Sequence, residues 1–443
     1  TPSLEAMFGS ALRCIQALAC GGDDDDDDDA IGATGIEGAP WCFKNSGFDP
    51  ADASLNDPEA IKMFLLWADI ALVKWTYLKG LREQGLPLPR RQEVEQLGSK
   101  ALVSRRELES LHCEGKFFTI DGMGEKTEVH LCAVSHAWES MEHPDPWNFQ
   151  LEQLVERFKH VHGLVWIFFD FVSLYQFPKT TGRQAASFNA ALQGMHILYA
   201  HDWMHVEILD ELTPAARKEH MNSKGHCAAV YWQRAERVQA VPVQVLKKNT
   251  TPYDLRGWCC AEREWSSLRD STNQRVPATP EIFKRGLANL AFTHRPDLEA
   301  VATLQAKVFA AKTRATRSLS FFKLDRDNKE RLCAALPRYP ALQDLSLYAT
   351  RFSEDEVKAI FRSSASTIRF EECDLGPAEV LPIRSILQKQ LPAVRRLHLG
   401  KCGISRDEVL RLHEIAHSKN IELHVSSALQ HDGPMMSAPP LFH

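Results

Sequence analysis

The last third of the chain repeats a short pattern, and this repetition constrains the fold more than any other feature. Residues 342–357, 365–380 and 394–409 align without gaps, each with apolar residues at the first, fourth and sixth places and each ending in Glu-Val. Looser copies surround Leu319 and Leu423. Because one copy is too short to bury its own apolar face, the copies must stack on one another. The pattern predicts a row of strands that begin near residues 319, 345, 368, 397 and 423, with helices between them.

The ninth place of two copies holds Cys373 and Cys402. Leucine-rich repeats put Asn or Cys at this place, so residues 316–428 resemble a short leucine-rich repeat α/β solenoid. In that setting the cysteines are expected to be small buried groups at a corner of the chain. Two copies also have the capping-box spacing that starts a helix, Ser353 with Glu356 and Ser405 with Glu408. The resemblance implies that a protein partner binds the repeats.

Length, charge and cysteine content limit the number of domains and the function classes that are possible for the chain. The 443 residues exceed the ~250–300 at which single cores stop growing, so two or more domains are expected. Lys plus Arg number 52 against 58 Asp plus Glu, which is not the basic excess of a nucleic-acid-binding protein. The most apolar stretch, residues 64–73, is far shorter than the ~20 residues that cross a bilayer, so no membrane span is expected. The 11 scattered cysteines favour reduced thiols and a cytoplasmic location.

The two ends of the chain have compositions that predict disorder. Residues 1–56 contain the aspartate run 23–29 among glycines, and such a segment cannot bury enough surface to fold. Residues 429–443 are expected to be a disordered tail. Between the acidic segment and residue 118, Asp57 and Pro58 supply a helix cap and a first-turn proline. Apolar residues then recur at helical spacing, so residues 57–117 are expected to be a helical N-terminal region that opens with one long helix.

Residues 118–280 alternate between strand and helix patterns. Apolar runs predict four strands, at 129–138, 164–174, 204–209 and 241–246. The first two are almost continuously apolar, which is typical of parallel strands that are covered on both faces. Helices are expected between them at 149–161 and 183–199. This alternation predicts a doubly wound α/β domain with a parallel sheet, followed by a helical linker at 281–315.

Polar residues lie where the first two expected strands end, and doubly wound sheets bind ligands at this edge. The residues concerned are Ser135, His136, Trp138 and Glu139 after the first strand, and Asp170, Ser173 and Gln176 after the second. The later stretch YDLRGWCCAERE, residues 253–264, is expected to start a helix at Gly257 with Cys259 and Glu262 on one face. We expect these three segments to meet at one edge of the sheet.

These segments resemble a known family. SHAW, the aromatic strand FFDFVSLYQ, the helix start RQAASF and the run Trp258-Cys259-(x)2-Glu262 are similar to the Toll/interleukin receptor (TIR) domain and to fungal heterokaryon-incompatibility domains, over roughly 118–275. The chain departs from the heterokaryon-incompatibility pattern because no glycine follows Trp138 and because Ser173 stands in a cysteine place. The resemblance implies a flavodoxin-like sheet and self-association into a homo-oligomer.

The resemblance also implies an activity, because the matching glutamate of plant TIR domains is the catalytic residue of NAD hydrolysis. Cleavage of the bond between nicotinamide and ribose passes through an oxocarbenium-like state, which one carboxylate can stabilise. Glu262 would be that carboxylate, NAD would be the substrate, and no cofactor would be required. The ligand pocket would be formed by Ser135, His136, Trp138, Asp170, Ser173 and Trp258.

Simpler interpretations of the same residues stay open. Glu262 equally fits a solvated helix glutamate, and Trp138 and Trp258 fit core aromatics. His130, Cys132 and His136 alternate along one strand, but a flat strand does not converge three ligands on a tetrahedral ion, so no metal is expected. Two functions therefore compete. We favour a signalling or immune-type scaffold over the alternative, an NAD(P) glycohydrolase.

Overall fold

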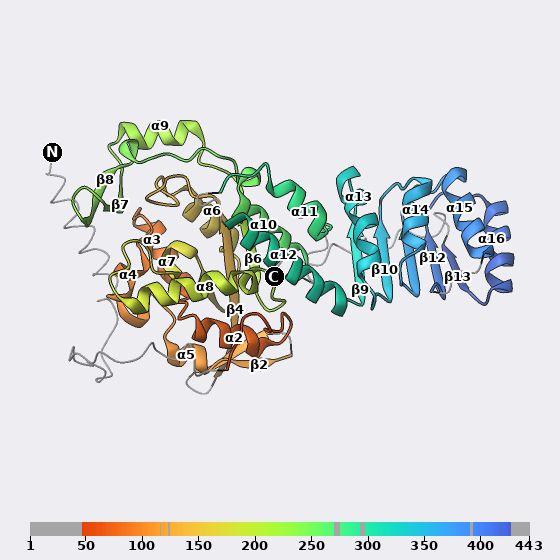
Figure 1. Cartoon of the computed structure of the whole chain (residues 1–443), viewed down its shortest axis with the longest axis horizontal. Coiled ribbons are helices and arrows are strands. Elements are labelled where there is room, and N and C mark those ends of the chain that lie inside the picture. The colour runs from red at the N-terminus through yellow and green to blue at the C-terminus, as the bar shows by residue number, and fades with distance from the viewer. Residues whose placement is uncertain are drawn as a thin grey trace. The chain divides into compact units, whose positions relative to one another are not determined.

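The computed structural model describes residues 47–115, 117–122, 125–269, 275–292, 297–389 and 393–426 (Figure 1). The expected disordered tail at 429–443 and most of the acidic segment at 1–56 lie outside these residues. Two compact units make up the chain, and the division falls between Cys259 and Cys260.

The first unit is built on a six-stranded mixed sheet with β4 at its centre. The long strand β4 (Glu125–His136) pairs in parallel with β5 (Leu164–Phe168) along one edge. Along its other edge, its second half pairs in parallel with β6 (His205–Leu209) and its first half pairs antiparallel with β3 (Phe117–Gly122). Two short strands complete the sheet, β1 (Val73–Lys74) beside β5 and β2 (His112–Glu114) beside β3. The expected α/β class with parallel strands is therefore confirmed.

Helices cover both faces of this sheet, as its apolar strands require. The crossovers between the parallel strands are α6 (Phe149–Phe158) and α8 (Gly182–Ala200), as the sequence predicts. On one face, Val134 and Ile167 pack into a single core with α6 and with α3 (Trp75–Glu83). On the other face, the ring of Phe168 contacts Tyr199 of α8. The strands are thus buried between two helical layers.

The sheet differs from the expected all-parallel one in two places. Residues 241–246 do not form a fourth parallel strand, because β8 (Arg237–Pro242) pairs antiparallel with β7 (Cys227–Trp232) in a separate two-stranded sheet. The expected strand 164–174 ends at Phe168, and a short helix α7 (Asp170–Ser173) follows. The hydroxyl of Ser173 accepts a hydrogen bond from the Phe169 N–H at 3.0 Å, which closes this turn.

The expected long helix after Asp57 is two helices. Asp57 caps α2 (Pro58–Trp67) as predicted, but the helix ends at Trp67 and α3 starts at Trp75. Asp69 between them has a φ of 50°, in the left-handed region that a helix cannot continue through. Its carboxylate pairs with Arg91 at 3.2 Å and with Arg183 at 3.0 Å. These distant partners, which helical periodicity does not reveal, fix the break.

The helix α2 packs closely on α8 through a glycine. A Cβ at Gly194 would lie only 2.1 Å from the ring of Phe64. Both residues are buried, and Phe64 is fully so. The missing side chain of Gly194 therefore sets the approach of the two helices.

The second unit ends in a five-stranded parallel sheet in the order β13-β12-β11-β10-β9. Before it come α10, α11 and α12, with the bounds Gly257–Ser267, Pro280–Leu287 and Asp297–Ala315. The strands are β9 (Ser318–Phe322), β10 (Asp344–Tyr348), β11 (Thr367–Glu371), β12 (Arg396–Gly400) and β13 (Glu422–Ser426). Figure 1 shows the helices that follow the first four strands, α13 (Arg326–Ala335), α14 (Glu354–Phe361), α15 (Pro377–Gln388) and α16 (Arg406–Ser418).

The register of these strands confirms the alignment of the repeats. Leu345 lies beside Leu319 and Ile368, and Leu397 lies beside Ile368 and Leu423. The predicted caps are present too, since the hydroxyls of Ser353 and Ser405 accept hydrogen bonds from the N–H groups of Glu356 and Glu408.

The chain turns in the same way after each of the first four strands. The residue after the strand has a φ near 50° and donates its N–H to the last carbonyl of the following strand; these residues are Lys323, Ala349, Glu372 and Lys401. Next to two of these corners, Cys373 and Cys402 are buried and direct their thiols to the carbonyls of Leu347 and Phe370 in the preceding strand. The corners are thus closed by contacts between neighbouring repeats.

The cysteines of the described residues are free thiols. Nor does the described part of the chain contain a helix that is long and apolar enough to cross a membrane.

Candidate functional site

The stretch from Tyr253 to Cys259 is bonded to the carboxyl end of β4. The hydroxyl of Tyr253 lies 2.5 Å from the hydroxyl of Ser135 and donates to the carbonyl of Cys259 at 2.9 Å. The thiol of Cys259 in turn faces the carbonyl of His136 at 3.4 Å. Ser135 and Tyr253 are buried. The expected meeting of these two segments, which lie more than a hundred residues apart, is confirmed.

A second set of contacts joins the ends of β4 and β5 through His136. Its Nε2 lies 2.8 Å from Oδ1 of Asp170, and its Nδ1 lies 2.8 Å from Oε1 of Gln150. Gln150 donates its amide to the carbonyl of Ala137 at 2.7 Å, so its Oε1 is left as an acceptor. Both ring nitrogens of His136 therefore face acceptors, an arrangement that the doubly protonated imidazolium satisfies.

Asp170 is the centre of this network. Its Oδ2 accepts the indole N–H of Trp138 at 2.7 Å, and its Oδ1 also accepts the N–H of Phe171 at 2.6 Å. Burial alone would raise the pKa of Asp170, but the charge of His136 and the hydrogen bonds from His136, Trp138 and Phe171 outweigh it and hold the pKa below its ordinary value. Asp170 is thus an ionised carboxylate, and 29% of its side chain is exposed.

The backbone beyond Trp138 is held by an arginine that the sequence did not single out. The buried guanidinium of Arg256 donates to the carbonyls of Trp138 at 2.5 Å and of Thr251 at 2.8 Å. Five donors in a rigid fork suit Arg for such multiple contacts. The Arg-Gly-Trp-Cys stretch therefore has a structural role that its sequence alone did not show.

Glu139, which follows Trp138, bonds to the segment after β6. Its carboxylate accepts the N–H of Thr213 at 3.0 Å and pairs with Lys218 at 2.7 Å. The side chain is fully buried, so these contacts compensate a charge that would be costly if left unpaired. Glu139 holds the segment after β6 against the end of β4.

Two further predicted residues of this edge have internal partners. Ser173 is fully buried and closes the turn of α7. Gln176 donates its amide to the carbonyls of Asp170 and Leu174, at 3.0 and 2.9 Å. Ser173 thus holds the backbone of Phe169, and Gln176 holds the backbone of Asp170.

The tryptophans of the predicted pocket are half-buried. Trp138 contacts the ring of Phe171 edge to face, with centroids 5.5 Å apart, and its indole N–H is used by Asp170. Trp258 lies in the first turn of α10. A half-exposed indole face can stack on a planar ligand ring.

Glu262 lies in α10, half-buried, one helical turn beyond Cys259. It belongs to the second unit, whereas the residues at the ends of β4 and β5 belong to the first. The catalytic role of Glu262 therefore stays a prediction, as does ligand binding by Ser135, His136, Trp138, Asp170, Ser173 and Trp258.

A buried pair that the sequence did not reveal lies in the loop after β4. His143 donates Nε2–H to the carbonyl of Leu88 at 2.9 Å, and its Nδ1 accepts the N–H of Asp145 at 3.1 Å, which is the bonding of a neutral imidazole. Burial lowers the pKa of His143 to about 4. Burial also raises the pKa of Asp145 to about 6, although Asp145 accepts the N–H groups of Phe149 and Leu151 at the start of α6.

The open face of the second sheet, turned away from the buried leucines, is a separate candidate surface. It carries one side chain from the middle of each strand, namely Ser320, Ser346, Arg369, His398 and His424. The rings of His398 and His424 stack with centroids 4.6 Å apart and an angle of 8°. His424 also contacts Oε1 of Glu422 at 2.6 Å. We refer to these five residues as the open sheet face.

No group of three or more His, Cys, Asp or Glu side chains that could hold a metal ion occurs within the described ranges. Comparison of the chain with protein-family models, curated proteins and solved structures gave no match.

Proposed function

We propose that the chain is a signalling or immune-type scaffold whose repeats bind a protein partner and whose TIR-like first unit self-associates in the cytoplasm. The observation that carries the proposal is the open sheet face. Five in-register strands place their middle side chains in one continuous row. Leucine-rich repeats, which this region resembles, use stacked strands in the same way to form extended binding surfaces.

The chemistry of the open sheet face suits a protein partner. It combines serine hydroxyls, a guanidinium and two imidazoles, which together offer hydrogen-bond donors and acceptors. Burial lowers the pKa of His398, and Arg369 and His424 lower it further. His398 is therefore a neutral group near pH 7, able to donate and accept at an interface.

Affinity purification of the full chain from its native extract tests partner binding. We expect the double variant Arg369→Glu with His398→Glu to lose bound proteins that the wild type retains, because it replaces a cation and a neutral imidazole on the open sheet face by two carboxylates. Arg411→Glu is the control, because Arg411 lies on α16 and not on the sheet. An identical set of bound proteins for all three chains would contradict the proposal.

Sedimentation of the purified chain over a range of concentrations tests self-association.

One observation supports the second candidate, an NAD(P) glycohydrolase. The first turn of α10 is bonded to the end of β4 through Cys259, and Glu262 follows one turn later on the same helix. Side chains three residues apart share a helix face. Asp170, Trp138 and His136 lie at the same end of β4 and supply a carboxylate and an aromatic face.

Nicotinamide release from NAD decides between the two candidates. We expect no release for a scaffold. If release occurs, Glu262→Gln must abolish it for Glu262 to be the catalytic carboxylate. Glu219→Gln, on the exposed helix α9 (Ala215–Ser223), is the matched control. Release that survives Glu262→Gln would exclude this residue as the catalyst.

A further inference from the structure

A groove between α14 and α15 lies outside both candidate sites. It has a volume of about 620 Å³, within the ~300–1,000 Å³ range of ligand-binding pockets. One wall is formed by residues of α14 and its C-cap, and the other wall is formed by residues of α15 and its C-cap. The lining includes Glu354, Lys358 and Arg362 on the first wall, and Ala378, Leu381, Pro382, Arg384 and Lys389 on the second.

Cations outnumber anions in this groove. Lys358, Arg362, Arg384 and Lys389 line it together with a single carboxylate, Glu354. Lys358 pairs with Glu354 at 2.6 Å, and Arg384 reaches Glu408 of α16 at 3.5 Å.

The remaining two cations have no such partner. Within the described part of the chain, neither Arg362 nor Lys389 has an ion pair or a side-chain hydrogen bond. Both are C-cap residues, Arg362 of α14 and Lys389 of α15. Their charges therefore gather at the end of the groove where both helices terminate.

The α15 side of the groove also carries apolar side chains. Leu381 is 50% exposed, so a ligand in the groove can contact its side chain. Ala378 and Pro382 extend this apolar part of the lining along α15.

We propose that this groove binds a short acidic peptide segment of a partner protein, with an aliphatic side chain on Leu381 and carboxylates at Arg362 and Lys389. Carboxylates bind Arg through paired, charge-assisted hydrogen bonds. A peptide also supplies the aliphatic side chain that Leu381 can contact, which a nucleic-acid backbone does not. The whole chain has a net charge of −6, which disfavours a polyanion as long as a nucleic acid. This site is on the helical side of the repeats and is independent of the open sheet face.

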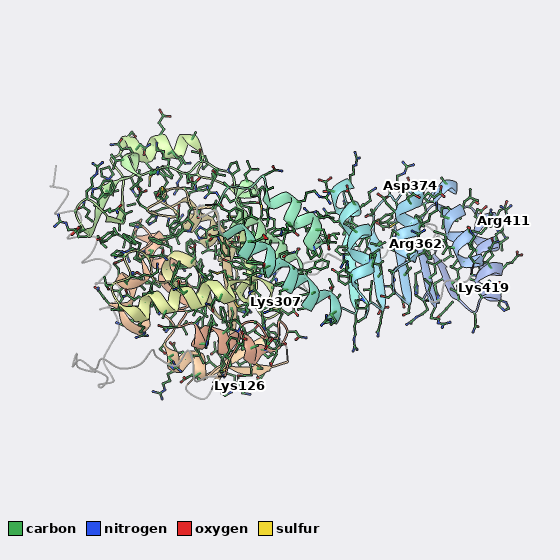
Figure 2. All side chains as sticks on the ribbon, in the orientation of Figure 1. Lys126, Lys307, Arg362, Asp374, Arg411 and Lys419 are labelled. Atoms are coloured by element: carbon green, nitrogen blue, oxygen red, sulfur yellow. The ribbon has the colours of Figure 1, made fainter. Side chains whose placement is uncertain are left out.

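The test measures fluorescence polarisation of a labelled synthetic peptide, in which glutamates flank one leucine, with the full chain. We expect the double variant Arg362→Gln with Lys389→Gln to weaken binding about tenfold, because two charge-assisted contacts are lost. Lys419→Gln is the matched control, since Lys419 is the C-cap of α16 but does not line the groove. Arg362 and Lys419 are both labelled in Figure 2. Equal weakening by the control, or none by the double variant, would overturn the proposal.

Two further measurements separate the apolar contact from charge alone. Leu381→Ser should weaken peptide binding, whereas Leu410→Ser, on α16 and 56% exposed, should not. On the unchanged protein, a peptide with glutamine in place of each glutamate should fail to bind. Binding of a single-stranded oligonucleotide more tightly than the acidic peptide would show that the groove is a nucleic-acid site, and the proposal would be wrong.

Discussion

The carboxylate of Asp170 lies 2.8 Å from the imidazole of His136, and the two residues come from the ends of neighbouring parallel strands. The indole N–H of Trp138 donates a hydrogen bond to the second oxygen of this carboxylate. This network fixes the edge of the sheet at which the sequence predicts a ligand. It also couples three side chains, so the costs of replacing them should not add.

Replacing Asp170 by asparagine should destabilise the first unit. His136 and Trp138 bond to different oxygens of the carboxylate, and asparagine has an NH₂ group in place of one of them, so one of the two hydrogen bonds is lost together with the negative charge that faces His136. We expect a loss of about 3 kcal/mol in the free energy of unfolding, typical of a broken buried ion pair. Urea unfolding measures this loss, with exposed Asp52→Asn as the control. A change as small as that of the control would show that the network contributes little.

The hydroxyl of Tyr253 should couple the helix start to β4. Tyr253→Phe removes its contacts with Ser135 and with the Cys259 carbonyl, and we expect a cost of about 2 kcal/mol at about 1 kcal/mol per hydrogen bond. In a double-mutant cycle with Ser135→Ala, the costs should not add, because both changes remove the same contact. Tyr231→Phe, on the half-exposed strand β7, serves as the control. Simple additivity would contradict the coupling.

His143 should make the stability of the first unit depend on pH. Its pKa of about 4 in the folded chain lies below the ordinary 6.5, so between these values the unfolded chain binds more protons. Stability from this group is therefore complete above pH 6.5 and is lost as the pH falls towards 4, by about 3 kcal/mol. His143→Gln lacks this proton, so its stability should approach that of the wild type as the pH is lowered. Parallel pH profiles of the two unfolding free energies would count against this assignment.

Replacing Glu264 by glutamine should lower the free energy of unfolding of the second unit. Its buried carboxylate pairs with Arg275 and Arg331, each at 2.7 Å, and accepts the N–H of Ala278. Burial would raise its pKa, but the two arginines outweigh this and lower it. Glu264→Gln removes the buried charge that pairs with both guanidinium groups, and we expect a loss of about 3 to 5 kcal/mol in the free energy of unfolding.

The control for Glu264 is an ion pair at the surface. Arg338 lies 3.0 Å from Glu281, and both side chains are more than half exposed. Arg338→Ala should cost less than about 1 kcal/mol, because water screens such pairs. Denaturant unfolding monitored by circular dichroism compares the two variants. Similar costs for both would show that burial does not strengthen the Glu264 pairs.

The features that the sequence predicts well are those that periodicity determines. Leu345, Ile368 and Leu397 lie side by side because each occupies the same place in a repeat, and stacking requires that place to coincide. The meeting of His136 with Asp170 follows similarly from the rule that parallel strands end at one edge.

The features that the sequence does not reveal depend on distant side chains. The helix break at Asp69 is held by Arg91 and Arg183, and nothing in the local pattern signals these partners. Arg256 bonds to backbone carbonyls, which carry no residue-type signature. The strands β7 and β8 form an antiparallel hairpin. The apolar pattern at the end of β8 predicts a buried parallel strand, because periodicity does not show which strand is the partner.

The corners after the repeat strands have one more consequence. Each corner N–H reaches forward to the strand of the next repeat, so a repeat does not complete its own hydrogen bonds but depends on its successor. Removal of β13 would leave Lys401 without an acceptor for its corner bond, which weakens the repeat of β12. The repeat before it would then lose the stable acceptor of its own corner bond. Thermal unfolding of these repeats should therefore begin at the last strand and proceed towards the first, instead of starting at any repeat with equal ease.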